Sequence, residues 1–141
     1  GIKEDGATVI AGGLGRPEGL NRGFYVRPTI FADVDNTARI NREEIFGPVM
    51  TIMPFDTEEE AIAIANDTPY GLTNYIQCGD QEQRQSVARQ LRSGMVETNS
   101  VGFGMGSPFG GYKQSGNGRE GGIFGLHEFM EIKAVSCWED K

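Results

Sequence analysis

The middle of the chain alternates between short apolar runs and longer segments whose apolar residues have helical spacing. The runs that predict strands are Val49–Phe55, Leu72–Cys78 and Met95–Thr98. Each interval between two of these runs predicts a helix. The order strand, helix, strand, helix, strand implies right-handed crossovers, and therefore a parallel, buried sheet. The predicted fold class is α/β, with a parallel-sheet βαβαβ portion.

Both predicted helices have a polar cap. Thr57 and Glu60 form a capping box at the start of the first helix, which ends near Asn66. Asp80 is expected to cap the second helix, and Gly94 to end it. The residues expected to face the core are Ala61, Ile62, Ala65, Val87, Ala88 and Leu91.

The flanking segments are predicted to be extended. Ala7–Ala11 is a candidate strand. Phe24–Val34 also has an extended pattern, but Pro28 lies within it and cannot donate to a sheet ladder, so we expect an edge position. Phe129–Trp138 alternates polar and apolar positions and predicts a C-terminal strand. Such a terminal strand is ordered only if something pairs with it.

Glycine is unusually frequent, with 21 residues, and many of them fall between Gly94 and Gly125. This stretch is too rich in Phe, Met and Tyr for a flexible linker, and it predicts a long ordered loop. Ligands of parallel α/β sheets bind at the carboxyl ends of strands. Because the loop starts after the third predicted strand, we expect a ligand loop over Asn99–Gly122.

Composition excludes several classes of function. The net charge is −7, from 13 basic and 20 acidic residues without a basic cluster, which argues against nucleic-acid binding. No apolar run reaches the length of a membrane span, and the start of the chain lacks a signal-peptide pattern, so a cytoplasmic protein is expected. Cys78, Cys137 and the single His127 predict neither a disulfide framework nor a metal site.

Two motifs carry candidate chemistry. In Glu44-Ile-Phe46-Gly-Pro48, the carboxylate can accept two hydrogen bonds from a vicinal diol such as a ribose, and the aromatic ring can pack against a planar ring. The alternative is a solvated Glu and a core Phe beside a turn. In the second motif, Pro108–Gly116, the pair Gly110-Gly111 would allow a strained turn within an ordered loop.

A third pattern is rejected. Residues 116–121 read Gly-Asn-Gly-Arg-Glu-Gly and fit the dinucleotide expression G-x-G-x-x-G. A dinucleotide fingerprint needs a hydrophobic strand immediately before it and a helix with a further strand after it. Neither is predicted here, which also argues against an autonomous dinucleotide-binding domain.

Arg42–Val49 and Pro108–Gly116, in this order, resemble the C-terminal part of the catalytic domain of NAD(P)-dependent aldehyde dehydrogenases. Arg27–Phe31 and Ala65–Leu72 strengthen the resemblance, which spans about residues 6–135. It implies that Glu44 holds the nicotinamide ribose and that Phe46 packs against the nicotinamide. Glu43 is then expected to be exposed.

The resemblance also implies a substrate path. Phe109 matches an aromatic residue of the family's substrate tunnel, and Phe103 matches a second one, with a core Phe as its alternative. Asn99 is implied to have a structural role, bonding loop backbone. An apolar tunnel of this kind would accept aliphatic or aromatic aldehydes, and a betaine-type aldehyde stays open as an alternative.

The family oxidises an aldehyde to a carboxylic acid with NAD or NADP through a Cys thioester. The nucleophilic Cys and the general-base Glu are implied to lie upstream of this chain, as does the cofactor-binding domain; Cys78 and Cys137 match neither role. Residues 1–128 then form an incomplete catalytic domain. Residues 129–141 form a C-terminal strand and tail that contacts another subunit in a homo-dimer or tetramer. The chain alone is expected to be inactive.

A different class of function stays open. The chain could be a non-catalytic module derived from this family that self-associates through Phe129–Trp138. A protein fragment that exposes apolar surface normally covered by other segments tends to associate.

Overall fold

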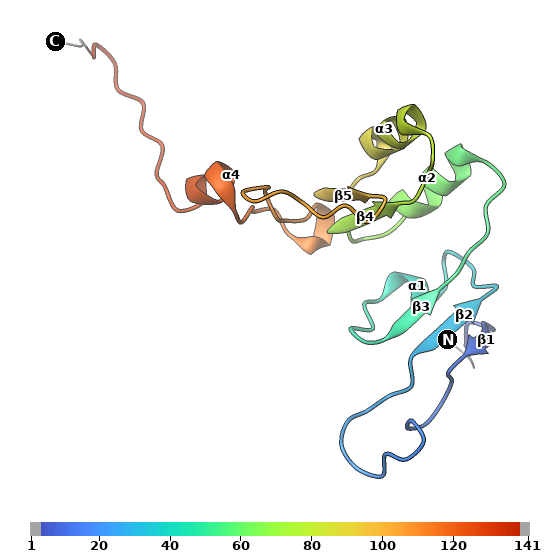
Figure 1. Cartoon of the computed structure of the whole chain (residues 1–141). Helices are drawn as coiled ribbons and strands as arrows, with labels where there is room; N and C mark the ends of the chain where they lie inside the picture. The colour runs from blue at the N-terminus through green and yellow to red at the C-terminus, as the bar shows by residue number, and fades with distance from the viewer. Residues whose placement is uncertain (1–3, 139–141) are drawn as a thin grey trace. The chain divides into compact units, whose positions relative to one another are not determined.

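The computed structural model describes residues 4–138. The chain divides into two compact units, residues 1–68 and 69–141, whose helices and strands are labelled in Figure 1. No helix among the described residues is long and apolar enough to cross a membrane.

The first unit contains a three-stranded sheet in the order β1-β2-β3. Strand β1 (Thr8–Ala11) pairs antiparallel with β2 (Thr29–Ala32), which pairs in parallel with β3 (Val49–Thr51). The expected edge position of the second segment is therefore wrong, since β2 is central. Pro28 is tolerated because it precedes the strand, and the first donor is the Thr29 N–H, which bonds the Pro48 carbonyl at 2.9 Å.

A small core lies under this sheet. Its buried members are Ala7, Phe31 and Val34, and its half-buried members are Val9, Ala38, Ile40 and Val49. Ile40 belongs to the short helix α1 (Arg39–Arg42). The N–H of Ile40 donates to the Asp5 carboxylate at 3.0 Å, so the start of this helix is tied to the chain that enters β1.

Helix α2 (Glu58–Asn66) has the predicted cap. The Thr57 hydroxyl accepts from the Glu60 N–H at 3.2 Å. The Glu60 carboxylate reaches back to the N–H of Asp56, at 2.8 Å, one residue before the position that a standard capping box uses. The expected core residues Ala61, Ile62 and Ala65 are only half-buried within this chain.

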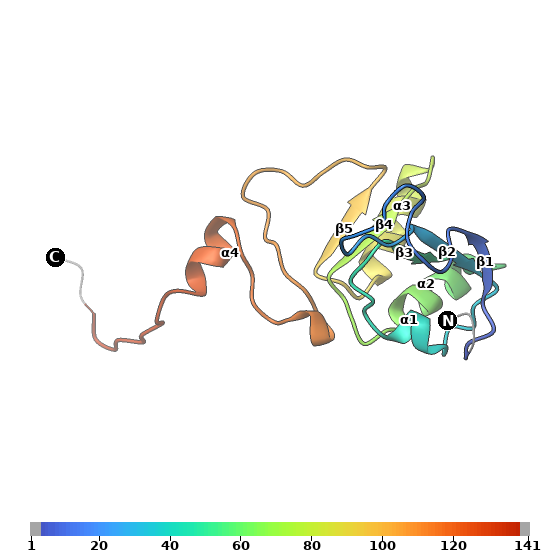
Figure 2. The same cartoon turned by 90° about the horizontal axis from the view of Figure 1, so that it is seen from below.

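The second unit begins with a strand–helix–strand motif. Strands β4 (Thr73–Ile76) and β5 (Met95–Thr98) pair in parallel and lie side by side in Figures 1 and 2, with α3 (Gln81–Gln90) connecting them. As predicted, the Asp80 carboxylate caps α3 and accepts from the Gln83 N–H at 2.7 Å. Among the described residues of this unit, the buried apolar side chains are Leu91 and Met95.

The prediction of one continuous βαβαβ sheet is wrong. Strand β3 pairs with β2, and β4 pairs with β5, so the described strands form two small sheets. Strands that are consecutive in sequence are neighbours in space only about two-thirds of the time. The prediction assumed that each new strand extends the same sheet.

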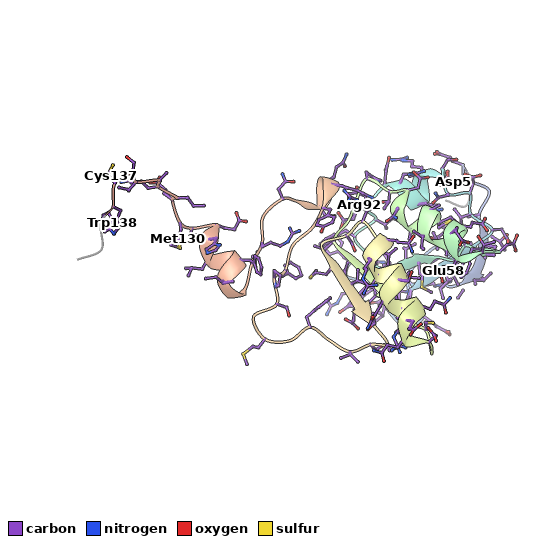
Figure 3. All side chains as sticks on the ribbon, turned by 90° about the horizontal axis from the view of Figure 1, so that it is seen from above. Asp5, Glu58, Arg92, Met130, Cys137 and Trp138 are labelled. Carbon is purple, nitrogen blue, oxygen red and sulfur yellow. The ribbon has the colours of Figure 1, made fainter. Side chains whose placement is uncertain are left out.

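The predicted C-terminal strand is also absent. After helix α4 (Gly122–His127), residues 129–138 have no regular secondary structure, and residues 139–141 lie outside the described residues. Figure 3 labels Met130, Cys137 and Trp138 on this segment. Its large apolar side chains are exposed, Ile132 by 98% and Phe129 by 90%. A strand needs a partner edge, and no described strand pairs with this segment.

Replacing Asp80 by Ala removes the acceptor for the Gln83 N–H at the start of α3. We expect the free energy of unfolding to fall by about 1 kcal/mol, as for other lost helix caps. Urea denaturation followed by circular dichroism measures this loss. Asp80→Asn keeps a side-chain oxygen and should retain most of the stability. An equal loss in both variants would show that the charge near the helix N-terminus matters and the cap does not.

Candidate functional site

Glu44 and Phe46 lie on an irregular turn between α1 and β3. Both side chains are exposed, and the Phe46 ring is 91% exposed, so Phe46 is no core residue of its unit. The backbone of Phe46 adopts a left-handed φ of 54°, which is uncommon for a bulky residue. Among the described residues, the Glu44 carboxylate has no hydrogen-bond or ion-pair partner. This carboxylate is therefore free to accept from a ligand.

An ion pair anchors the chain just before this turn. The Arg42 guanidinium donates two hydrogen bonds to the Asp67 carboxylate, at 2.6 and 3.1 Å, and a third to the Asp67 carbonyl at 2.6 Å. The Asn36 amide donates to the same carboxylate at 2.8 Å. Bidentate Arg–carboxylate geometry fixes direction as well as distance. The pair thus connects the end of α1 to the end of α2, two residues before Glu44.

The two adjacent glutamates have different surroundings. Glu43 is exposed, as expected, and accepts from the Arg39 guanidinium at 2.9 Å, one helical turn earlier. This hydrogen bond lowers the pKa of Glu43 below its ordinary value. Glu43 is therefore engaged with its own helix, whereas Glu44 points its carboxylate at no described group.

The glycine-rich loop is closed at its base. Phe109 and Glu120 exchange two backbone hydrogen bonds, each 2.7 Å long. The Arg119 guanidinium braces the loop from within, because it donates to the carbonyls of Gly111 at 2.9 Å and Gly118 at 2.7 Å. The same guanidinium lies 5.4 Å from the centre of the Tyr112 ring, a cation–π distance. The loop is thus ordered by its own contacts.

The loop starts at the carboxyl end of β5, as predicted, but its later part docks at the opposite end of the strands. Gly71 and Gly94 stand just before β4 and β5. The Gly71 carbonyl accepts from the N–H of Gly94 at 3.0 Å and of Tyr112 at 2.8 Å, and the Gly71 N–H donates to the Ser115 hydroxyl at 3.0 Å. The carboxyl-end argument therefore covers only the first part of the loop.

Glycine is required at positions 71 and 94 because a backbone carbonyl of another residue lies very close to each of them. A Cβ on Gly94 would stand 1.8 Å from the Gly110 carbonyl oxygen, and one on Gly71 would stand 2.6 Å from the Arg92 carbonyl oxygen. Gly110 and Gly111 lie outside the left-handed region, so the strained turn expected at this pair is not present. Close backbone packing explains them instead.

Phe103 and Phe109 are both only partly covered, with 46% and 51% of their surface exposed. Phe109 lines a depression of about 330 Å³ with the loop residues Gly111 and Arg119 and with Phe129 after α4, but Phe103 is not in its wall. The structure therefore places the two expected substrate residues on one loop without bringing them into one cavity. Glu44 and Phe46 belong to the first unit, and the two substrate residues belong to the second.

Asn99 has a structural role, but its partner is the backbone after β4 and not that of the glycine-rich loop. Its side chain accepts from the Cys78 N–H at 2.9 Å and donates to the Cys78 carbonyl at 3.0 Å, which fixes the chain after β4 to the end of β5. The Cys78 thiol donates to the Gln83 side-chain oxygen at 3.1 Å. An amide oxygen is no base that could activate a thiol.

The remaining sequence expectations concern cofactor and metal motifs. The pattern at residues 116–121 follows the short 3₁₀ helix Lys113–Ser115 and precedes the six-residue helix α4, so it lacks the strands of a dinucleotide fingerprint. Within residues 4–138, no group of three His, Cys, Asp or Glu side chains could hold a metal ion.

Sequence reasoning missed three supporting residues. Arg42 contacts Asp67 at the end of another helix, and the Gly71 carbonyl accepts from two segments distant in sequence. Arg119 donates to carbonyls of its own loop. Only the position of Arg119 inside a glycine-rich stretch could have indicated it.

Comparison with known proteins identifies the family. Residues 1–135 match the aldehyde dehydrogenase family, and the chain belongs to this family. It is 55% identical over 135 residues to a 3-succinoylsemialdehyde-pyridine dehydrogenase from Pseudomonas sp., covering 96% of this chain and 28% of that protein.

Solved structures agree. The crystal structure of an aldehyde dehydrogenase from Bartonella henselae matches with a TM-score of 0.90 and 57% identity, over 94% of this chain and 28% of that one. A mutant of aldehyde dehydrogenase C from Pseudomonas syringae in complex with NAD⁺ and octanal matches with a TM-score of 0.89 and 52% identity, over 92% and 27%. The chain therefore spans little more than a quarter of the length of these relatives.

Replacing Gly94 by Ala places a methyl group against the Gly110 carbonyl. We expect the free energy of unfolding to fall by about 1–3 kcal/mol, as in other overpacked sites, with faster proteolysis of the 108–120 loop. Gly79→Ala is the matched control, because a Cβ there meets nothing within 4 Å. The docking of the loop at Gly94 is contradicted if both variants unfold at the same denaturant concentration as the parent chain.

Proposed function

We propose that this chain supplies the nicotinamide-riboside contacts and part of the substrate path of an NAD(P)⁺-dependent aldehyde dehydrogenase. The observation that carries the proposal is the pair Glu44 and Phe46. One turn carries both the Glu44 carboxylate, which has no partner among the described residues, and the exposed Phe46 ring. The Arg42–Asp67 ion pair anchors the chain just before this turn. The exposure of Phe46 is not that of a core phenylalanine within this unit.

The two side chains suit the two halves of a nicotinamide riboside. An ionised carboxylate has two acceptor oxygens, which match the two hydroxyl groups of a ribose. The face of the Phe46 ring can pack on a planar ring. NAD⁺ and NADP⁺ share this riboside, so these contacts serve either dinucleotide. When bound, the cofactor accepts the hydride of the aldehyde.

The substrate proposal rests on Phe103 and Phe109. Both aromatic residues are half-exposed on the ordered glycine-rich loop, where they offer an apolar lining to an aliphatic or aromatic aldehyde. The octanal bound to the Pseudomonas syringae relative is a molecule of this kind. The covalent chemistry of the family needs an activated thiol and a base. We assign neither role to Cys78 or Cys137, so both groups would come from segments upstream of this chain.

The test compares two adjacent glutamates in the full-length subunit that contains this sequence. Glu44→Gln removes a charge-assisted hydrogen bond to the ribose, which is worth about 1.5–3 kcal/mol, so we expect the KM for NAD⁺ to rise roughly 10- to 100-fold. Production of NADH in the presence of an aldehyde measures it. Glu43→Gln, which removes only one of the two acidic partners that Arg39 has among the described residues, should leave the KM for NAD⁺ unchanged.

Two outcomes would contradict the proposal. One is an equal effect of the two substitutions, which would show that Glu44 has no special contact with the cofactor. The other is aldehyde-dependent NADH production by the 141-residue chain alone, which would mean that this chain contains its own nucleophile.

A second candidate function is a non-catalytic module that self-associates through residues 129–138. The exposed apolar side chains of this segment favour it (Figure 3), because a strand-like alternation without a paired edge is a template for another chain. The same surface would serve the proposed subunit contact of a dimer or tetramer.

Sedimentation of the 141-residue chain tests this association. We expect a dimer or larger species, and a shift toward monomer when Ile132 is replaced by Asp, since a charge at an apolar contact is costly to bury. Lys133→Asp is the matched control, because it changes the neighbouring polar position of the alternation. A chain that is monomeric at all concentrations would exclude the self-associating module.

A further inference from the structure

One dipeptide of the glycine-rich loop has its own chemistry. Asn117 is followed by Gly118, and both residues are exposed in irregular backbone. In the part of the chain that the structure describes, the Gly118 N–H has no acceptor. We propose that Asn117 is a site of spontaneous deamidation, and that its modification releases the brace that Arg119 provides in the loop.

The reaction needs only water. The backbone nitrogen of Gly118 loses its proton and attacks Cγ of Asn117, which forms an N–Cγ bond. The bond from Cγ to the side-chain nitrogen breaks, and ammonia leaves with the proton. Water then opens the resulting succinimide at either carbonyl and gives Asp or isoaspartate. No redox change occurs. The absence of a Cβ on Gly118 leaves its nitrogen accessible to this attack.

The other asparagines are less suited to deamidation than Asn117. Four of them donate their side-chain amide to a described acceptor, namely Asn36, Asn41, Asn74 and Asn99. Asn66 lies within helix α2. Asn21 is exposed and irregular like Asn117, but the following residue is Arg22, whose side chain hinders the backbone nitrogen. Asn21 is therefore an internal control in the same molecule.

The surroundings of Gly118 explain why modification matters. Its carbonyl accepts from the Arg119 guanidinium at 2.7 Å. This carbonyl is also packed against the backbone of Gly110, because a Cβ on Gly110 would stand only 2.2 Å from its oxygen. Isoaspartate adds a methylene group to the backbone at this point and displaces the carbonyl. It also adds a negative charge to a chain whose net charge is −7.

The experiment ages the 141-residue chain in mildly alkaline buffer at physiological temperature and maps its peptides by mass spectrometry. We expect Asn117 to convert to Asp and isoaspartate about tenfold faster than Asn21, since only the former precedes glycine. Gly118→Ala should remove this difference. The variant is expected to fold, because its Cβ would meet only the Glu128 carboxylate, at 3.7 Å. Equal rates at Asn117 and Asn21, or no slowing in Gly118→Ala, would overturn the site.

The second measurement tests whether the contacts of Arg119 still hold the loop after Asn117 is modified. Hydrogen exchange at the N–H groups of Phe109 and Glu120 should be faster in aged protein than in fresh protein. Asn117→Asp supplies the charge without the extra methylene, so unchanged exchange in this variant assigns the effect to the backbone insertion. If aged protein that contains isoaspartate keeps full protection at both groups, the proposed release of the loop is overturned.

Discussion

The carbonyl oxygen of Gly71 is the point on which the second unit depends. It accepts one hydrogen bond from the residue that leads into β5 and another from the glycine-rich loop, at 3.0 and 2.8 Å. Three segments that are distant in sequence therefore meet at one backbone atom. This meeting is possible only because Gly71 and Gly94 lack side chains, since a Cβ on either would overlap a neighbouring carbonyl. Backbone contacts thus hold the loop that carries Phe109. Its Phe109 side chain is therefore not needed for this docking and can contact a ligand.

In the first unit, an ion pair holds the functional turn in place. The turn that presents Glu44 is irregular, and such segments hold a geometry only when rigid elements fix their ends. The Arg42–Asp67 pair provides one anchor, and the pairing of β3 with β2 provides the other. Exposed ion pairs contribute little stability individually. The bidentate geometry and the third bond to the Asp67 carbonyl therefore matter for direction, and direction is what a residue that contacts a cofactor requires.

Local features of the fold could be predicted from the sequence, and long-range ones could not. The caps at Thr57 and Asp80 and the β4–α3–β5 motif depend on residues close together in the chain, and all are present. The central place of β2 depends on its pairing with β3, about twenty residues later, which no local pattern encodes. The motif around Glu44 and Phe46 was visible, but the anchor at Asp67 and the brace at Arg119 were not. Both act through contacts that leave no period in the sequence.

The C-terminal segment has the sequence pattern of a strand but not the structure of one, and this difference has a physical reason. Residues 129–138 alternate as a strand does, yet the described structure pairs them with no edge. An alternating pattern that burial within the chain does not explain indicates burial against something else. The two-stranded sheet β4-β5 leads to the same conclusion, because two strands alone are marginally stable in water. The chain matches its family over residues 1–135 but spans 28% of a full-length relative. The exposed apolar pattern is therefore consistent with the proposal that residues 129–138 contact another subunit.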